Sequence, residues 1–215
     1  AVNLGWSNRD VKSELQALVN LPVAVGNDAN VAALGELWLG AAAGAKDAIM
    51  FTLGTGVGGG VIVDSKVVAG VHGAGGEIGH ISVVLEDGNQ CNCGKKGCLE
   101  TVASATGIVR ETEKYLAACD EASSLRELAK IEAKDVFDAA KAGDAVGVKM
   151  VNQLGRYIGL AAANLAVTTD PQKIIIGGGV SKAGDILIDT IEKHYKEFAF
   201  ATVRDTQFVL AELGN

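Results

Sequence analysis

The stretch AIMFTLGTGVGGGVIVDSKVV, residues 48–68, decides the fold class. Its apolar runs at 48–53 and 60–64 are separated by a glycine-rich turn, and the link Ser65–Lys66 leads into a third run at 67–71. Short apolar runs bounded by turn residues are typical of β-strands. We therefore predict three antiparallel strands joined by hairpins.

Further strands and helices flank this stretch. The hydrophobic pattern predicts strands at 22–25, 81–85, 173–176 and 207–210, helices at 11–19, 29–39 and 181–198, and mostly helix from 100 to 167. Antiparallel strands, then helices, then a strand–glycine–helix unit indicate an α/β domain with a mixed sheet flanked by helices.

The composition narrows the classes of function. The 215 residues include 28 glycines and 2 prolines, 48% are hydrophobic, and the formal net charge is -7. Such a chain can build a core, and its acidity argues against a nucleic-acid surface over the whole molecule. No apolar run approaches the roughly 20 residues of a membrane span, and no secretory signal precedes the first helix. We expect a cytoplasmic protein with no nucleic-acid or membrane partner.

One imidazole and three thiols lie close together in the sequence. His80, Cys91, Cys93 and Cys98 are the ligand types of a closed, four-coordinate zinc site. Glycines inside the loop allow it to turn tightly enough for the thiols to converge. The sequence predicts a structural Zn²⁺ site, and the alternative is a cysteine-rich turn with unused thiols.

Two glycine-rich turns follow predicted strands. Leu53–Gly60 contains five glycines and the Thr55 hydroxyl, and Ile174–Val180 contains three glycines before a helix. Bare backbone N–H groups in such turns can approach phosphate oxygens. Neither turn is a Walker or Rossmann motif, and ordinary tight turns explain each one equally well.

Three carboxylates lie where they could meet a polar ligand. Asp28 stands at a strand-to-helix junction, where it either caps the helix or acts as a general base. Glu77 lies three residues before His80, and Glu100 follows the last clustered cysteine by two. A metal at the cysteines would bring Glu77, His80 and Glu100 into one neighbourhood suited to sugar hydroxyls. The alternative for either glutamate is simple solvation.

Five motifs occur here in one order. They are Asn27-Asp-Ala-Asn30, Leu53-Gly-Thr-Gly-Val-Gly-Gly59, Gly76-Glu-Ile-Gly-His80, Cys91-x-Cys-Gly-x-x-Gly-Cys-x-Glu100 and Ile176-Gly-Gly-Gly-Val180. Together they resemble the ROK family (repressors, open reading frames, kinases) over essentially the whole chain, and most of all its bacterial glucokinases. The resemblance implies an actin-like, ribonuclease-H-like fold that transfers the γ-phosphoryl group of ATP to a hexose.

The resemblance also assigns roles to residues. It makes Asp28 the base that accepts the proton of the sugar 6-hydroxyl, and Asn27, Glu77, His80 and Glu100 the ligands of the other hydroxyls. It places Thr55 and Gly56 at the ATP phosphates and Gly178 and Gly179 on the adenosine side, with Mg²⁺ neutralising the phosphates. His80 would bind zinc through one ring nitrogen and face the sugar with the other. A homodimer that binds ATP and a hexose, with glucose favoured, is implied.

The chain departs from the family pattern in one respect. The Asp-x-Gly-x-Thr phosphate turn that opens family members does not occur here. We therefore predict that residues 1–40 are the end of an amino-terminal lobe and 41–215 a carboxy-terminal lobe. The 215 residues alone would bind zinc and bind sugar weakly, with little or no turnover. A sheet edge exposed beside residues 23–25 would favour association.

Other functions share these motifs. The alternative to a kinase is the sugar-sensing domain of a ROK-type transcriptional repressor, and a third reading is a zinc-stabilised fold without activity. Retained Asp28 and the complete glycine run favour the kinase. The motifs leave open which hexose is used, since hydroxyl specificity depends on small differences in site geometry. They also leave open whether polyphosphate replaces ATP.

Overall fold

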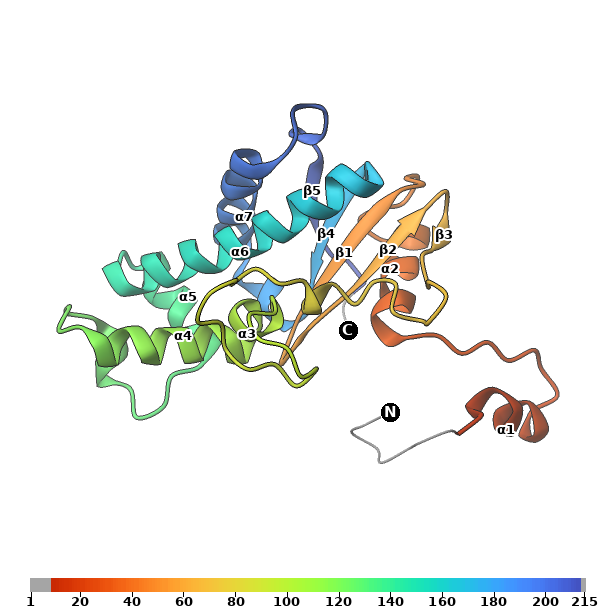
Figure 1. Ribbon diagram of the computed structural model, residues 1–215, viewed down its shortest axis with the longest axis horizontal. Helices are drawn as coiled ribbons and strands as arrows, with labels where there is room; N and C mark the ends of the chain where they lie inside the picture. Colours follow the sequence, from red (N-terminus) through yellow and green to blue (C-terminus); the bar gives the residue numbers. More distant parts are fainter. Residues whose placement is uncertain (1–8, 214–215) are drawn as a thin grey trace.

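The computed structural model describes residues 9–213 and consists of one mixed five-stranded sheet with helices on both faces (Figure 1). The strands are β1 (Ala48–Leu53), β2 (Val57–Val63), β3 (Lys66–Val67), β4 (Lys173–Gly177) and β5 (Gln207–Leu210), in the order β3-β2-β1-β4-β5. β1, β2 and β3 pair antiparallel, while β4 pairs parallel with both β1 and β5. The predicted hairpins and the predicted mixed sheet are confirmed.

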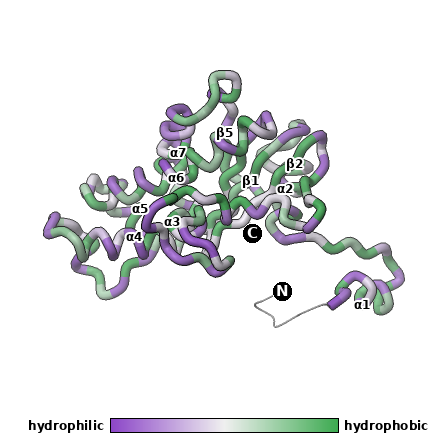
Figure 2. The backbone as a smooth tube through the Cα atoms, in the orientation of Figure 1, coloured by the Kyte–Doolittle hydropathy of each residue, from purple (hydrophilic) through white to green (hydrophobic). Residues whose placement is uncertain are grey.

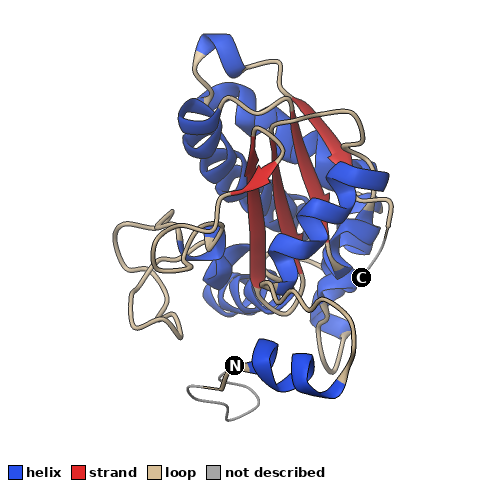
Figure 3. Cartoon of the chain, turned by 90° about the vertical axis from the view of Figure 1, so that its right-hand side faces the viewer, coloured by secondary structure: helices blue, strands red, loops and turns tan. Residues whose placement is uncertain are grey.

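The sheet separates two hydrophobic clusters. Alternate residues of β1 point to opposite faces, so Ile49 and Phe51 enter the larger cluster with the long helices, while Ala48 and Met50 enter the smaller one. Helix α2 (Asp28–Leu39) covers the smaller cluster and packs on β2 and β1 (Figure 3). Hydrophobic residues are concentrated on the central strands (Figure 2).

The predicted helical region from 100 to 167 is divided by capping residues. It contains α3 (Glu100–Ala103), α4 (Ala105–Ala118), α5 (Ala133–Lys141) and α6 (Ala145–Thr169), with a 3₁₀ turn at Ser124–Glu127. Ser104 and Asp144 cap α4 and α6, because their side chains accept the backbone N–H groups that each new helix leaves free, and at the start of α5 the Asp135 side chain accepts the Glu132 N–H at 2.8 Å. The 181–198 helix is likewise a 3₁₀ turn, Gly179–Ala183, followed by α7 (Asp185–Phe198).

Two predicted strands are wrong. Residues 22–25 pair with no described strand, and the Val23 N–H donates to the Gln16 side chain instead. There is consequently no sheet edge beside 23–25. Residues 81–85 form only an isolated bridge, Ser82 to Cys98, because the N–H groups of Val83 and Val84 both donate to Gly97 O in the cysteine loop.

Smaller boundaries also differ. β2 begins at Val57 rather than at residue 60, and β3 is only two residues long. The hairpin between them turns at Asp64–Ser65, and both of these residues have positive φ. The predicted first helix is confirmed as α1 (Val11–Leu18), which has no buried residue and lies apart from the sheet (Figure 1). No helix in the described part of the chain is long and apolar enough to span a membrane.

Candidate functional site

The glycine run in β2 allows two elements to approach the strand from opposite sides. A Cβ at Gly60 would lie 2.6 Å from the Ala33 Cβ of α2, whereas a Cβ at Gly59 would lie 2.1 Å from Ile78 Cδ1. Ile78 begins the 3₁₀ turn Ile78–His80. The run therefore has a packing function: it places the start of α2 and the Glu77–His80 segment on either side of β2.

Helix α2 begins with the predicted base, but that residue is not the cap. Asn27 is the N-cap, and its side chain accepts the Asn30 N–H at 3.2 Å. Asp28 is the first helical residue, and its carboxylate accepts the Ala29 N–H at 2.8 Å and is exposed. Asp28 is thus not the N-cap residue, although its carboxylate accepts one of the first N–H groups of α2. Its exposed carboxylate at the positive end of the helix is available to a ligand.

The three predicted thiols and the imidazole come together. The ligand atoms of His80, Cys91, Cys93 and Cys98 all lie within 4.8 Å of one another. Cys91 Sγ is 3.6 Å from His80 Nδ1, and Cys93 Sγ is 3.6 Å from Cys98 Sγ. Zinc–sulfur bonds of about 2.3 Å in a tetrahedron put two sulfurs about 3.8 Å apart. The donor set and its spacing therefore fit a tetrahedral metal ion.

The surroundings of two of these thiols shift their pKa values in opposite directions. Burial, together with hydrogen bonds to Cys93 and Cys91, raises the pKa of the Cys98 thiol to about 12. A hydrogen bond from the Lys95 backbone lowers the pKa of Cys93. A buried thiol becomes a thiolate at neutral pH only when a nearby cation compensates its charge. Without such a cation Cys98 stays protonated at neutral pH, so it is not a reactive thiol.

The second ring nitrogen of His80 points away from the cysteines. His80 Nε2 lies 3.9 Å from Glu77 Oε2, and the Lys95 ammonium donates to His80 O at 2.8 Å. The side chains of Glu77 and His80 are 49% and 34% exposed, respectively. An imidazole nitrogen and a carboxylate, both partly exposed, therefore lie side by side next to the four candidate metal ligands.

Glu100 connects the metal loop to the first glycine turn. It starts α3, two residues after Cys98, and its Oε2 accepts the Val57 N–H at 3.2 Å. A Cβ at Gly56 would lie 2.3 Å from that oxygen, so only glycine leaves space for the carboxylate. Ser104 Oγ donates to Glu100 O at 2.7 Å and holds the short helix in place.

The two glycine turns meet at one edge of the sheet. β1 and β4 are parallel, with Thr52 opposite Gly177, so both turns leave the carboxyl ends of neighbouring strands. Gly178 has φ +85°, and a Cβ there would lie 2.5 Å from Leu53 O. Ligands of open α/β sheets bind at this edge. The structure therefore places Gly178 beside Leu53, the residue from which the first glycine turn leaves β1.

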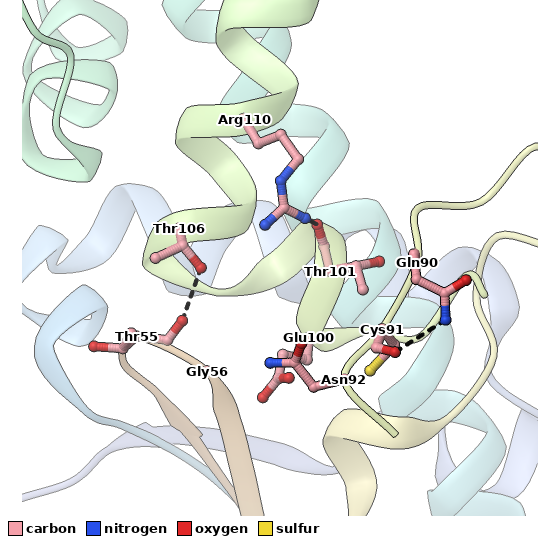
Figure 4. A pocket seen from close by; sticks show the side chains of 9 residues that line it. All are labelled: Thr55, Gly56, Gln90, Cys91, Asn92, Glu100, Thr101, Thr106 and Arg110. Atoms are coloured by element: carbon pink, nitrogen blue, oxygen red, sulfur yellow. Dashed lines mark hydrogen bonds between the residues drawn. The ribbon is translucent and has the colours of Figure 1, made fainter. Parts of the chain in front are cut away.

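A cavity of about 390 Å³ opens between the first glycine turn and the metal loop (Figure 4). Predicted residues Thr55, Gly56, Cys91 and Glu100 line it, and Asn27, Asp28, Glu77 and His80 do not. Five further lining residues were not predicted: Gln90, Asn92, Thr101, Thr106 and Arg110. Their one sequence signal is the four-residue spacing of Thr106 and Arg110, which puts both on one face of α4. The Thr106 hydroxyl donates to Thr55 O at 2.9 Å.

This geometry agrees with the sequence profile of the ROK family, which matches residues 1–215. The chain belongs to the ROK family. It is 50% identical to a glucokinase of Halalkalibacterium halodurans, over 100% of this chain and 66% of that protein. It is 32% identical to a xylose repressor of Caldicellulosiruptor bescii, over 93% of this chain and 50% of that protein.

Solved ROK structures have the same fold. The ROK glucokinase of Streptomyces griseus, determined with glucose and AMPPNP, superposes with a TM-score of 0.84 and 39% identity, over 97% of this chain and 69% of that one. The expected actin-like lobe, a mixed sheet flanked by helices, is confirmed. The ROK chain described here spans about two thirds of the length of these glucokinases.

Proposed function

We propose that this ROK chain belongs to an ATP-dependent hexose kinase that phosphorylates the 6-hydroxyl of glucose. The observation that carries the proposal is the position of Glu100, which links the metal group to the phosphate turn through Val57 N. Sugar-binding carboxylates and a phosphate-binding turn must adjoin in a kinase, because the transferred group passes directly between the two substrates. The similarity to glucokinases over the whole chain supports glucose as the sugar.

The residues have separate parts in this reaction. The exposed Asp28 carboxylate accepts the proton of the 6-hydroxyl as that oxygen attacks the γ-phosphorus. Asn27, Glu77, His80 and Glu100 hold the remaining hydroxyls and fix the attacking oxygen in line. Backbone N–H groups at Thr55 and Gly56 bind the phosphates, and Gly178 and Gly179 contact the adenosine side. Mg²⁺ enters bound to ATP, as part of the substrate. Most of the rate acceleration comes from positioning and charge.

The metal in this proposal is a structural Zn²⁺ held by His80, Cys91, Cys93 and Cys98. Four protein ligands leave no open position for water, so the ion supplies rigidity rather than chemistry. Because Nδ1 of His80 faces the thiols, Nε2 stays free for the sugar, and metal binding sets the tautomer.

Replacing Asp28 by Asn tests the assigned base. In the full-length protein we expect phosphorylation to fall by about 10²–10⁴-fold, the usual contribution of general base catalysis, while glucose affinity stays close to that of the unsubstituted protein. ADP release would be followed in a coupled assay, with glucose binding measured by calorimetry. Exposed Asp205→Asn is the matched control. Near-normal turnover of the Asp28 variant would remove Asp28 as the base.

A sugar-sensing domain of a ROK transcriptional repressor is the second candidate function, favoured by the similarity to a xylose repressor. The metal group and the sugar-binding residues would serve a kinase and a sensor alike. Only turnover distinguishes the two functions. Sugar binding without ADP release, in full-length protein containing one zinc per chain, would favour the sensor. ADP release that depends on Asp28 would favour the kinase.

Three further properties belong to the same proposal. We infer a homodimer, a cytoplasmic location, and a lobe boundary near residue 40. Light scattering of the purified chain tests the dimer. Limited proteolysis tests the boundary: cleavage near 40 should leave residues 41–215 intact, although α2 packs on the sheet of that lobe.

A further inference from the structure

Among residues 9–213, one buried side-chain nitrogen or oxygen has no hydrogen-bond partner: Asn30 Oδ1, in the first turn of α2. The Asn30 N–H donates to the Asn27 side chain at 3.2 Å, which fixes the backbone of this residue. A Cβ at Gly60 would lie 3.3 Å from Asn30 Cα, so α2 lies directly on the bare backbone of β2. Nearly all buried polar groups of folded proteins have a partner, so this oxygen requires an explanation.

Asn30 Oδ1 lies against Gly76, the residue before the predicted sugar ligand Glu77. A Cβ at Gly76 would lie 2.8 Å from Asn30 Oδ1 and 3.1 Å from Gly59 O, and φ is +85° at this position. Only glycine lets the loop approach α2 so closely. The Gly76 N–H donates to no acceptor within the described residues, 9–213. An unpaired acceptor on α2 thus faces the residue that carries an unpaired donor.

The segment that contains Gly76 can shift toward α2. Four of the seven residues at 70–76 are glycine, and residues 71–74 are exposed. Glu77 is itself weakly held, since its N–H donates to Ala74 O at 3.3 Å and its carboxylate lies 3.9 Å from His80 Nε2. A ligand that binds the Glu77 carboxylate would therefore move Gly76 together with Glu77.

We propose that Asn30 is a positioning residue for Glu77, and that sugar binding completes a hydrogen bond from the Gly76 N–H to Asn30 Oδ1. The proposal rests on the proposed function, because Glu77 meets the sugar there. The new bond holds Glu77 close to the start of the helix that carries Asp28. The sugar-bound state gains a bond that the free state lacks, so the bond adds to sugar affinity. Without sugar, this link between the two faces of β2 is open.

Asn30→Leu in the full-length, zinc-loaded protein separates this role from a structural one. Leucine keeps the branched shape of asparagine but removes the unpaired oxygen. We expect the melting temperature to stay the same or rise, while glucose affinity, measured by calorimetry, falls about 3–10-fold, the effect of one neutral hydrogen bond. Asn164→Leu, at an exposed asparagine of α6, is the control and should leave glucose affinity unchanged.

A second variant and a direct readout complete the test. Asn30→Asp keeps an acceptor oxygen at the same position, so its glucose affinity should exceed that of Asn30→Leu. Its stability should be lower than that of Asn30→Leu, because the buried carboxylate has no partner in the sugar-free protein. Hydrogen exchange of the Gly76 amide, followed by NMR, should slow about tenfold when glucose saturates the unsubstituted protein. It should not slow in Asn30→Leu.

The contrary results are equally definite. Loss of stability in Asn30→Leu would show that the side chain already bonds within the sugar-free protein, and would overturn the proposal. Unchanged glucose affinity of Asn30→Leu would also overturn it. So would Gly76 exchange that does not respond to glucose. If the unsubstituted full-length protein binds no sugar, the proposed function itself fails, and the role of Asn30 fails with it.

Discussion

Strand β2 has a functional element on each face, and the two are held in different ways. On one face, α2 and its Asp28 are placed by the small side chains of Ala29 and Ala33 against bare glycine backbone. On the other face, Ile78 packs on Gly59, and His80 is held by the metal group. One half of the site therefore depends on contacts within the chain and the other, in the proposed function, on a bound cation. We expect the two halves to respond independently to mutation.

The α2 face has a second fixing point in a buried carboxylate. Glu36 is 1% exposed and accepts three backbone N–H groups: Ala41 at 2.9 Å, Glu212 at 3.1 Å and Leu213 at 2.8 Å. These bonds tie the end of α2 to the segment that follows β5. Glu36 therefore holds α2 in place through hydrogen bonds. On the other face, the proposed metal ion would hold the Glu77–His80 segment in place.

Replacing a metal ligand should have the largest effect on the site. We expect that effect to be confined to the face of β2 that carries His80. We expect Cys98→Ser to lower metal affinity by more than about 100-fold, the upper range seen when only an outer-shell partner of a ligand is removed. Glucose affinity should fall with it, because Glu77, His80 and Glu100 lose their common support. Emission spectrometry measures the zinc and calorimetry measures the sugar.

Hydrogen exchange separates the two faces in the same variant. Protection of backbone amides should decrease over residues 77–100 and persist over 28–39. Equal loss of protection over 77–100 and 28–39 would show that the two halves of the site are not independent. Cys119→Ser, at a cysteine outside the metal group, is the matched control.

Replacing Glu36 should have the next largest effect, on the opposite face. Glu36→Ala removes the acceptor of three backbone N–H groups, and each lost hydrogen bond costs about 1–1.5 kcal/mol. We expect the free energy of unfolding to fall by roughly 3–5 kcal/mol, with full zinc content at temperatures where the variant is folded. Urea denaturation measures the change, and Glu113→Ala, at an exposed glutamate, should shift it very little. Loss of zinc from the folded Glu36→Ala variant would show that the two faces of β2 do not respond independently to mutation.

A methyl group in the glycine run should have the smallest effect of the three. The new Cβ of Gly60→Ala would meet Ala33 Cβ at 2.6 Å, so α2 must move away from the sheet. We expect a destabilisation of about 1–3 kcal/mol, typical of overpacking. Gly54→Ala is the matched control, because its Cβ would meet no atom within 4 Å. Similar stabilities of the two variants in thermal unfolding would show that close packing does not position α2.

The convergence of the four candidate metal ligands and the main hairpin were predicted correctly because their signals are local. His80 and the three clustered cysteines offer the right ligand types at short spacing, and the runs at 48–53 and 60–64 carry their own turn residues. The strands predicted at 22–25 and 81–85 are wrong for one reason. An apolar run becomes a strand only when another strand accepts its hydrogen bonds, and a run carries no information about its partner.

The sequence by itself determined which chemistry this ROK chain contains: four metal ligands, two glycine turns, and carboxylates at Asp28, Glu77 and Glu100. Only the tertiary structure decided how they combine. It showed that Asn27 rather than Asp28 caps α2, that the glycines of β2 make room for α2 and Ile78, and that Glu100 reaches Val57 N. It also brought Arg110 into a cavity with Glu100. Ligand types and turns are properties of short segments, whereas these contacts join residues far apart in the chain, whose meeting depends on how the sheet and helices pack.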